Sequence, residues 1–236
     1  MTTRWCAVVV DSADPAGLAR FYATLLGGPV TREDEHAVDV ALADGLDLVF
    51  VPVPDPKVVK NRVHLDLASA SPEDQAAIVA RAVELGAKPV DIGQGDVPWV
   101  VLADPEGNEF CVLEQRDEYD DNGPVAAVVV DARDPRAQAA FWTGPTGLPV
   151  AREGDDFASL PRPVGPSLEF VRVPEPKAVK NRVHLDLAPP ADGDLRTEVA
   201  RLEAWGAVRA DVGQRDVPWV VLADPEGNEF CVLTPR

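Results

Sequence analysis

The chain repeats itself at a fixed spacing of 120 residues, and this duplication constrains its fold more than any other feature. The segment KNRVHLDLA occurs at Lys60–Ala68 and again at Lys180–Ala188, and DVPWVVLADPEGNEFCVL occurs unchanged at Asp96–Leu113 and Asp216–Leu233. Because the spacing is constant, no net insertion separates the copies, and both copies predict the same fold. The segments between these blocks differ widely, which indicates that the matching blocks do the same structural or chemical job twice.

The two copies are joined by Gln115–Pro124, with the sequence QRDEYDDNGP, which is acidic and rich in turn-forming residues. We therefore predict a first domain at residues 1–115, an acidic linker at 116–124 and a second domain at 125–236. Each predicted domain has the usual size of an independent folding unit.

Each copy is predicted to contain two units with the order strand, helix and three strands. In copy one the first unit starts with a strand at Arg4–Val10, and its helix begins after Asp14-Pro15 and ends at Gly27. The second unit starts with a strand at Arg62–Leu67, and its helix runs from the Ser71-Pro72 cap to Gly86. The other predicted strands are Pro29–Arg32, Ala37–Leu42, Leu46–Val53, Pro89–Ile92, Trp99–Ala103 and Phe110–Glu114.

The first helix of copy two differs from its counterpart in copy one. Gly144-Pro145 follows Phe141-Trp142 directly. Because proline cannot donate a helical hydrogen bond, this helix is predicted to be short or kinked.

Strand alternation separates a core face from a working face, because successive side chains point to opposite sides. In Arg62–Leu67 the apolar residues take the core side, so that Arg62, His64 and Asp66 share the other side. In the last strand Glu109 and Cys111 share that other side as well. We predict ligand-binding residues at Arg62, His64, Asp66, Trp99, Glu109 and Cys111, and at their counterparts Arg182, His184, Asp186, Trp219, Glu229 and Cys231.

An alternative reading assigns these residues a structural role. A histidine and an aspartate on one strand can hydrogen-bond neighbouring backbone and stabilise the sheet, and tryptophans flanked by valines often belong to a core.

The net charge of −18 narrows the classes of partner. It predicts repulsion from nucleic acids and anionic membranes, and it favours a neutral or cationic small organic ligand. No apolar run approaches the length of a membrane span, and no basic N-terminal segment with an apolar core predicts a targeting signal. The three cysteines do not form a disulfide pattern, which favours a reducing, cytoplasmic location.

The doubled order of elements, the His-Leu-Asp-Leu strand and the Asp-Pro-Glu-Gly-Asn-Glu-Phe hairpin resemble the glyoxalase / bleomycin-resistance / extradiol-dioxygenase superfamily, also called vicinal oxygen chelate. Within it, the chain is most similar to the glyoxalase-like domain branch. The resemblance implies an α+β fold in which two βαβββ units form a cupped, eight-stranded mixed sheet. It does not imply one reaction, because this fold hosts several.

The resemblance also implies where a metal ion would bind, since in metal-dependent members four strands each donate one ligand. By position, these places are Ala7, Val49, His64 and Cys111 in copy one, and Ala127, Glu169, His184 and Cys231 in copy two. Copy one offers two donors, so we expect no metal there. Copy two offers Glu169, His184 and Cys231, a set that suits zinc but not the iron of ring-cleaving dioxygenases.

Three functions remain open from the sequence. The first is a small-molecule-binding protein of the drug-sequestering or resistance type, with no required cofactor. The second is a metal-dependent lyase or isomerase that uses domain 2 only, with Glu169 or Glu229 as the base. The third is a structural or partner-binding tandem domain.

Four units in one chain favour a monomer, with a dimer as the alternative. The sequence leaves open whether units pair within one copy or across copies.

Overall fold

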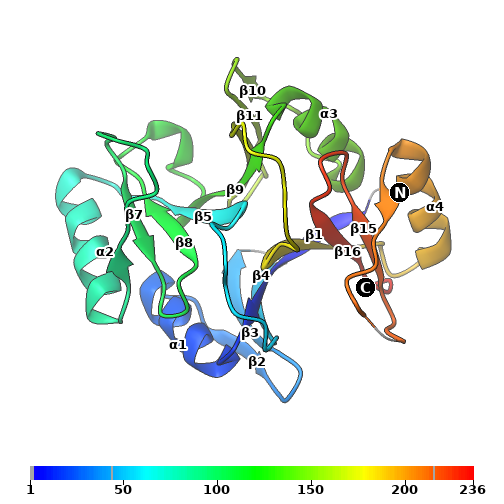
Figure 1. Cartoon of the computed structure of the whole chain (residues 1–236), viewed down its shortest axis with the longest axis horizontal. Coiled ribbons are helices and arrows are strands. Elements are labelled where there is room, and N and C mark those ends of the chain that lie inside the picture. The colour runs from blue at the N-terminus through cyan, green and yellow to red at the C-terminus, as the bar shows by residue number, and fades with distance from the viewer. Residues whose placement is uncertain (1–2, 44, 215) are drawn as a thin grey trace.

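The computed structural model describes residues 3–43, 45–214 and 216–236, which form two eight-stranded mixed sheets with α-helices packed on them (Figure 1). The described elements of the first copy are β1 (Arg4–Ser12), α1 (Pro15–Leu26), β2 (Val30–Glu33), β3 (Val38–Ala43), β4 (Leu46–Pro52), β5 (Val63–Leu67), α2 (Pro72–Glu84), β6 (Lys88–Pro89), β7 (Val100–Ala103) and β8 (Glu109–Val112). The predicted order of strand, helix and three strands is confirmed in both units.

The second copy repeats these elements after a short 3-10 helix at Asp117–Tyr119 in the linker. Its described elements are β9 (Val125–Ala132), α3 (Pro135–Thr146), β10 (Arg152–Glu153), β11 (Phe157–Leu160), β12 (Ser167–Arg172), β13 (Val183–Ala188), α4 (Leu195–Trp205), β14 (Val208–Arg209), β15 (Val220–Ala223) and β16 (Glu229–Val232).

Each sheet takes one unit from each copy, which answers the pairing question that the sequence left open. Sheet A has the strand order β14-β15-β16-β13-β1-β4-β3-β2, and sheet B has the order β10-β11-β12-β9-β5-β8-β7-β6. In sheet B, β9 of copy two runs antiparallel to β5 of copy one, with His64 opposite Val129. In sheet A, β1 pairs in the same way with β13.

Chain connections account for this arrangement. The linker carries the chain from the end of β8 to the start of β9, and both strands belong to sheet B. The loops 53–62 and 173–182, which we call the crossover loops, instead carry the chain from one sheet to the other. Both crossover loops contain spaced prolines, which favour an extended path.

The helix α1 begins and ends where the sequence predicts. The Asp14 carboxylate accepts a hydrogen bond from the Gly17 amide at the start of α1, and Gly27 adopts the left-handed conformation at its end. On α1, Tyr22 stacks on Phe50 of sheet A at a ring distance of 5.5 Å, while Phe21 meets Phe110 of sheet B at 6.1 Å. The two sheets therefore share one core that lies between them on their helix sides.

The first helix of copy two was expected to be short or kinked, and its length shows that it is not short. α3 has 12 residues, the same number as α1, and Pro145 lies inside its last turn. Proline leaves the carbonyl of Phe141 without its helical donor, and the indole N–H of Trp205 on α4 donates to this oxygen at 2.7 Å. A contact between helices thus replaces the hydrogen bond that the proline removes.

Strand alternation is confirmed at the centre of both sheets. On β5 the side chains of Val63, Leu65 and Leu67 are buried in the shared core, and Phe110 on β8 joins them. Cys111 and Leu113 lie on the opposite side, in a separate small cluster.

Among the described residues, none of the helices has the length and apolar character that a membrane span requires.

Candidate functional site

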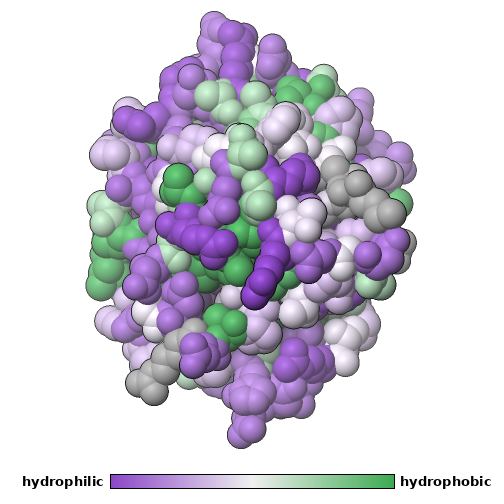
Figure 2. Space-filling model, turned by 90° about the vertical axis from the view of Figure 1, so that its right-hand side faces the viewer, coloured by the Kyte–Doolittle hydropathy of each residue, from purple (hydrophilic) through white to green (hydrophobic). Residues whose placement is uncertain are grey.

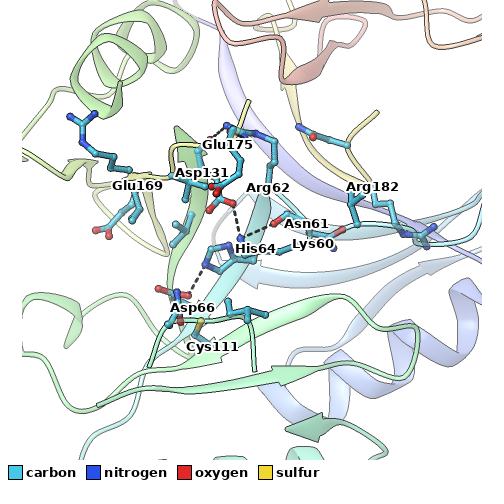
Figure 3. A pocket seen from close by; sticks show the side chains of 18 of the residues that line it. Lys60, Asn61, Arg62, His64, Asp66, Cys111, Asp131, Glu169, Glu175 and Arg182 are labelled. Atoms are coloured by element: carbon cyan, nitrogen blue, oxygen red, sulfur yellow. Dashed lines mark hydrogen bonds and ion pairs between the residues drawn. The ribbon is translucent and has the colours of Figure 1, made fainter. Parts of the chain in front are cut away.

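A large cavity lies against the side of sheet B that is turned away from the helices (Figure 3). Its volume is about 1140 Å³, and its lining comes from β5, β8, β9 and β12, from the linker and from both crossover loops. Because β5 and β8 belong to copy one and β9 and β12 to copy two, neither copy forms this cavity alone.

Three side chains of copy one meet on the floor of the cavity (Figure 3). The imidazole Nε2 of His64 lies 3.5 Å from the Oδ1 of Asp66. Cys111 sits directly opposite Asp66 in the parallel pairing of β5 with β8. One donor atom from each of the three lies within 4.8 Å of the others. The prediction that His64 and Cys111 lie side by side is therefore confirmed, and Asp66 joins them.

Burial shifts the pKa values of His64, Asp66 and Cys111, which we call the trio. It lowers the pKa of the His64 imidazole to about 3, an effect to which the charge of Lys60 adds, so His64 is neutral at pH 7. It raises the pKa of the Asp66 carboxyl to about 7 and raises the pKa of the Cys111 thiol as well. The trio therefore offers a neutral imidazole and a thiol beside a carboxyl group that sits near its titration point.

Sheet A carries the same trio from copy two. His184 lies 3.5 Å from Asp186 between Nε2 and Oδ1, and Cys231 faces Asp186 across the β13–β16 pair. One donor atom from each lies within 4.8 Å of the others. The prediction that His184 and Cys231 lie side by side is confirmed, although neither residue lines the large cavity.

The proposed zinc set Glu169, His184 and Cys231 is not brought together. Glu169 belongs to β12 of sheet B, whereas β13 and β16, which carry the other two residues, belong to sheet A. In sheet B, Val129 lies between Glu169 and His64 in register, so two strand spacings, about 10 Å, separate their backbones. The expectation failed because ligands were grouped by copy, while sheets form across copies.

The linker fills the place beside Glu169. The Tyr119 hydroxyl lies 3.1 Å from both carboxylate oxygens of Glu169, the Ser159 hydroxyl donates to Oε1 at 2.8 Å, and Arg152 donates to the same oxygen at 3.0 Å. The Arg152 guanidinium also lies over the Tyr119 ring, 5.6 Å from its centroid. Glu169 therefore ties the linker to sheet B, and its carboxylate is already satisfied.

Arg62 and Arg182 line the cavity, but their guanidinium groups hold the two copies together. Arg62 donates to the Glu175 carbonyl at 2.8 Å, to the Asp131 carbonyl at 2.5 Å and to Glu226 at 3.4 Å. Arg182 makes the matching bonds to the carbonyls of Asp55 and Asp11 and to the carboxylate of Glu106. Each arginine thus fastens its own crossover loop to the other one.

Glu109 and Glu229 fasten the crossover loops to the last hairpins and do not line the cavity. Glu109 accepts from the Lys57 ammonium at 2.7 Å and from the Asn61 amide at 3.0 Å. Glu229 makes the same contacts to Lys177 and Asn181. The identical hairpin blocks therefore perform the same structural job twice.

The two tryptophans lie in different surroundings. Trp99 lines the cavity and donates its indole N–H to Gln94 at 2.9 Å, while the Arg116 guanidinium lies 5.8 Å from the centroid of its ring. Trp219 is 37% exposed and lies outside the cavity. Of the predicted ligand-binding residues, the cavity lining contains Arg62, His64, Asp66, Trp99, Cys111 and Arg182, and it does not contain Glu109, His184, Asp186, Trp219, Glu229 or Cys231.

Apart from Arg62 and Arg182, sequence reasoning missed the residues that the linker and the crossover loops bring to the cavity. Tyr119 is the only aromatic residue of the linker, a signal that could have marked it as buried. Lys60 belongs to the repeated KNRVHLDLA block and pairs with Asp131 of copy two at 2.6 Å. No local pattern marked Arg152 or the crossover residues Pro174 and Val179 as cavity-lining.

The four-strand metal site that the resemblance implied does not fit either sheet. Sheet A carries Ala7 and Val49 at two of the four places, with His184 and Cys231 at the others. Sheet B carries Ala127, and its Glu169 carboxylate is held by three neighbours. A four-strand site of the family type therefore lacks donors on the strands β1, β4 and β9, and no step of a reaction is derived through such a metal.

A family model described as "Glyoxalase-like domain" matches residues 7–113 and 127–233. No curated protein matches the chain. Among solved structures, glyoxalase I from Zea mays is similar at 15% identity and a TM-score of 0.66, covering 99% of this chain and 92% of that one. A putative dioxygenase from Bacillus subtilis is similar at 14% identity and a TM-score of 0.67, covering 99% and 85%. At these identities the two likenesses show the fold alone.

Proposed function

Because the chain belongs to the glyoxalase-like domain family, we propose that it binds an organic small molecule in the cavity over sheet B. The observation that carries the proposal is the cavity of about 1140 Å³, which slightly exceeds the roughly 300–1,000 Å³ of common small-molecule sites. A structural or partner-binding domain has no need of such a space, and filling it with side chains would stabilise the fold.

The walls of the cavity suit an organic ligand with an apolar body. Apolar side chains surround the polar floor, and they come from both copies and from the crossover loops. They include Trp99, Leu113, Val129, Phe157, Val171, Val173 and Val179. A few polar groups in an otherwise apolar cavity are the usual arrangement of a site that holds and orients a small molecule.

The charges around the cavity favour a neutral or cationic ligand. Each described lysine or arginine in the lining already pairs with a carboxylate: Lys60, Arg62, Arg116, Arg152, Arg172, Lys180 and Arg182. At the cavity mouth Asp55 and Glu175 are exposed, and neither carboxylate has an ion-pair partner among the described residues. The molecule also presents a mostly hydrophilic surface on the face drawn in Figure 2, and its net charge is −18.

We propose that this binding does not require a metal, as in a sequestering protein of the drug- or metabolite-binding type. The support is the apolar wall, which contacts a ligand directly. The second function, a lyase or isomerase confined to domain 2, required the metal set Glu169, His184 and Cys231, with Glu169 or Glu229 as the base. Glu169 lies on sheet B, whereas His184 lies on sheet A. Glu229 accepts from Lys177 at 2.6 Å and from the Asn181 amide at 3.1 Å, so neither base stands free beside that metal set.

A thermal-shift screen tests the proposal. The full chain would be heated with aromatic cations and with neutral, natural-product-like compounds, each with and without chelator, since a ligand that binds the native state raises the melting temperature. We expect stabilising compounds in both conditions. If no compound stabilises the chain under any condition, small-molecule binding is wrong, and stabilisation that depends on added metal would replace it with a metal-dependent site.

A matched pair of variants locates the binding. Val171→Trp places a large ring in the cavity, whereas Val51→Trp makes the same change at the counterpart position on sheet A. We expect Val171→Trp to abolish the ligand-induced shift and Val51→Trp to leave it intact. Equal effects of both variants would show that the ligand does not occupy the cavity over sheet B.

A further inference from the structure

The trio on each sheet combines three donor types from two neighbouring strands. Histidine and aspartate occupy alternate positions on one strand, and cysteine comes from the strand beside it. Around a tetrahedral zinc ion, bonded donors are about 3–4 Å apart, given Zn–N and Zn–S bonds of about 2.0–2.3 Å. The donor atoms of each trio lie within 4.8 Å of one another, so small side-chain rotations bring them to such spacing.

Unpartnered atoms point to a missing ligand at both places. The Oδ1 atoms of Asp66 and Asp186 are shut off from solvent. The Nε2 atoms of His64 and His184 lie 3.5 Å from them but form no hydrogen bond with them. The Nδ1 of His64 is also buried without a hydrogen-bond partner among the described residues. Buried polar atoms without a partner cost about 1–3 kcal/mol each and are uncommon in native proteins. The same aspartate oxygen is unpartnered in both copies, within the sequence blocks that the two copies share.

The donor chemistry selects the ion. A thiolate favours a soft or borderline metal over magnesium or calcium, and an imidazole together with a carboxylate suits zinc. Three protein donors also leave a fourth tetrahedral place for water or another small ligand.

We propose that the chain binds two zinc ions, one at His64, Asp66 and Cys111 and the other at His184, Asp186 and Cys231. These sites differ from the four-strand site that the family resemblance implied, because each uses two strands of one copy and takes an aspartate from outside the four expected places. The expectation that copy one holds no metal counted His64 and Cys111 alone. Asp66 supplies the third donor. Binding of zinc at these two sites is separate from the binding of an organic ligand proposed above.

Zinc alone is the probe in the first experiment. The full chain would be stripped with a chelator, titrated with zinc against a chromophoric competitor, and then analysed for bound metal after desalting. We expect two zinc ions per chain, one in Cys111→Ala or in Cys231→Ala, and none in the double variant. Alanine replaces a buried cysteine with another small apolar group, and circular dichroism without metal checks the fold of each variant.

Cys6 provides the matched control. It is a buried, free cysteine that lies on the same side of sheet A as Cys231 but belongs to neither trio. We expect Cys6→Ala to retain two zinc ions. Loss of a residue that only hydrogen-bonds a metal ligand lowers metal affinity by roughly 10–100-fold. Because Asp66 is proposed to bind the ion directly, Asp66→Asn should lower the zinc affinity of the first site by more than this and leave the affinity of the second site unchanged.

Cobalt substitution tests directly whether the cysteine thiolates bind the metal. A cobalt-loaded wild-type chain should show thiolate-to-cobalt charge-transfer absorption, and Cys111→Ala should lose half of it. The proposal is overturned if the wild-type chain holds no more zinc than the double variant, if Cys6→Ala loses as much metal as Cys231→Ala, or if cobalt binds without charge-transfer absorption.

Discussion

The hydroxyl of Tyr119, in the linker between the two copies, lies 3.1 Å from both carboxylate oxygens of Glu169 on β12. This contact turns a connecting segment into part of the cavity wall. It also occupies the one carboxylate that the family resemblance had marked as a metal ligand.

Replacing Tyr119 with phenylalanine should destabilise the chain. The change removes a hydrogen bond to a charged group, which is worth about 1.5–3 kcal/mol, and Ser159 and Arg152 still hold Glu169. Urea denaturation would measure the loss. Glu118→Gln is the control, because its ion pair with Arg152 is exposed and should contribute less than about 1 kcal/mol. Equal losses in both variants would contradict a buried role for Tyr119.

The Tyr119 phenol should ionise later than an ordinary tyrosine. Burial and the charge of Glu169 raise its pKa from 10.0 to about 12. Because the folded pKa lies above the unfolded one, the stability that Tyr119 contributes is complete below about pH 10 and is lost as the pH rises from about 10 to 12. Ultraviolet titration of tyrosinate absorbance in a Tyr22→Phe background would isolate this group. Ionisation near pH 10 in the folded chain would contradict the prediction.

Arg62 and Arg182 should make similar contributions to stability, because they form matching bonds between the crossover loops. Arg62→Met removes the guanidinium and leaves Glu226 and two carbonyl groups without this donor, at a cost of about 3–5 kcal/mol. Arg182→Met should cost a similar amount by equilibrium unfolding. Arg20→Met, at an exposed position of α1, is the control and should change stability by less than about 0.5 kcal/mol. A mild effect at Arg62 would show that the crossover contacts are dispensable.

Gly144→Ala should destabilise the chain, although the same change inside a helix usually stabilises by about 0.5–1 kcal/mol. A Cβ at this position would lie 2.4 Å from the Trp205 ring. Such overpacking costs about 1–3 kcal/mol, and it would also disturb the Trp205 hydrogen bond to Phe141. Thermal unfolding would measure the effect. In a Trp205→Ala background the sign should reverse, and a destabilisation that persists there would rule out the clash.

The first copy alone, residues 1–115, should form a dimer, whereas the full chain is predicted to be a monomer. In the full chain β1 pairs with β13 and β5 pairs with β9, so an isolated copy loses the partner of both strands. Because β13 and β9 are the repeat counterparts of β5 and β1, a second copy restores both pairings. Light scattering after size-exclusion chromatography would give the masses. A well-folded monomer of the first copy would show that its units can pair with each other.

The repeat spacing, the helix caps and strand alternation predicted four strand–helix–strand–strand–strand units and put His64 and Cys111 on the same side of their strands. The family resemblance supplied the strand order that makes them neighbours. These features are local, since a cap needs neighbouring residues and alternation needs one strand. The length of α3 was not predictable in the same way. Pro145 is tolerated because Trp205, which lies 60 residues further along the chain, supplies the missing donor.

Strand partners and long-range contacts were decided by the tertiary structure alone. The sequence of a strand shows which of its side chains share a face, but it does not show which strand pairs with it. The linker and the crossover loops determine the strand pairing, because they set which units can reach each other. For this reason Glu169 meets Tyr119 rather than His184, and Arg62 binds backbone carbonyls of the other copy rather than a ligand. Strand alternation, which can be followed in the sequence, predicts which residues share a face. Which faces line one cavity follows only from the folded chain, because it depends on how the units cross between the sheets.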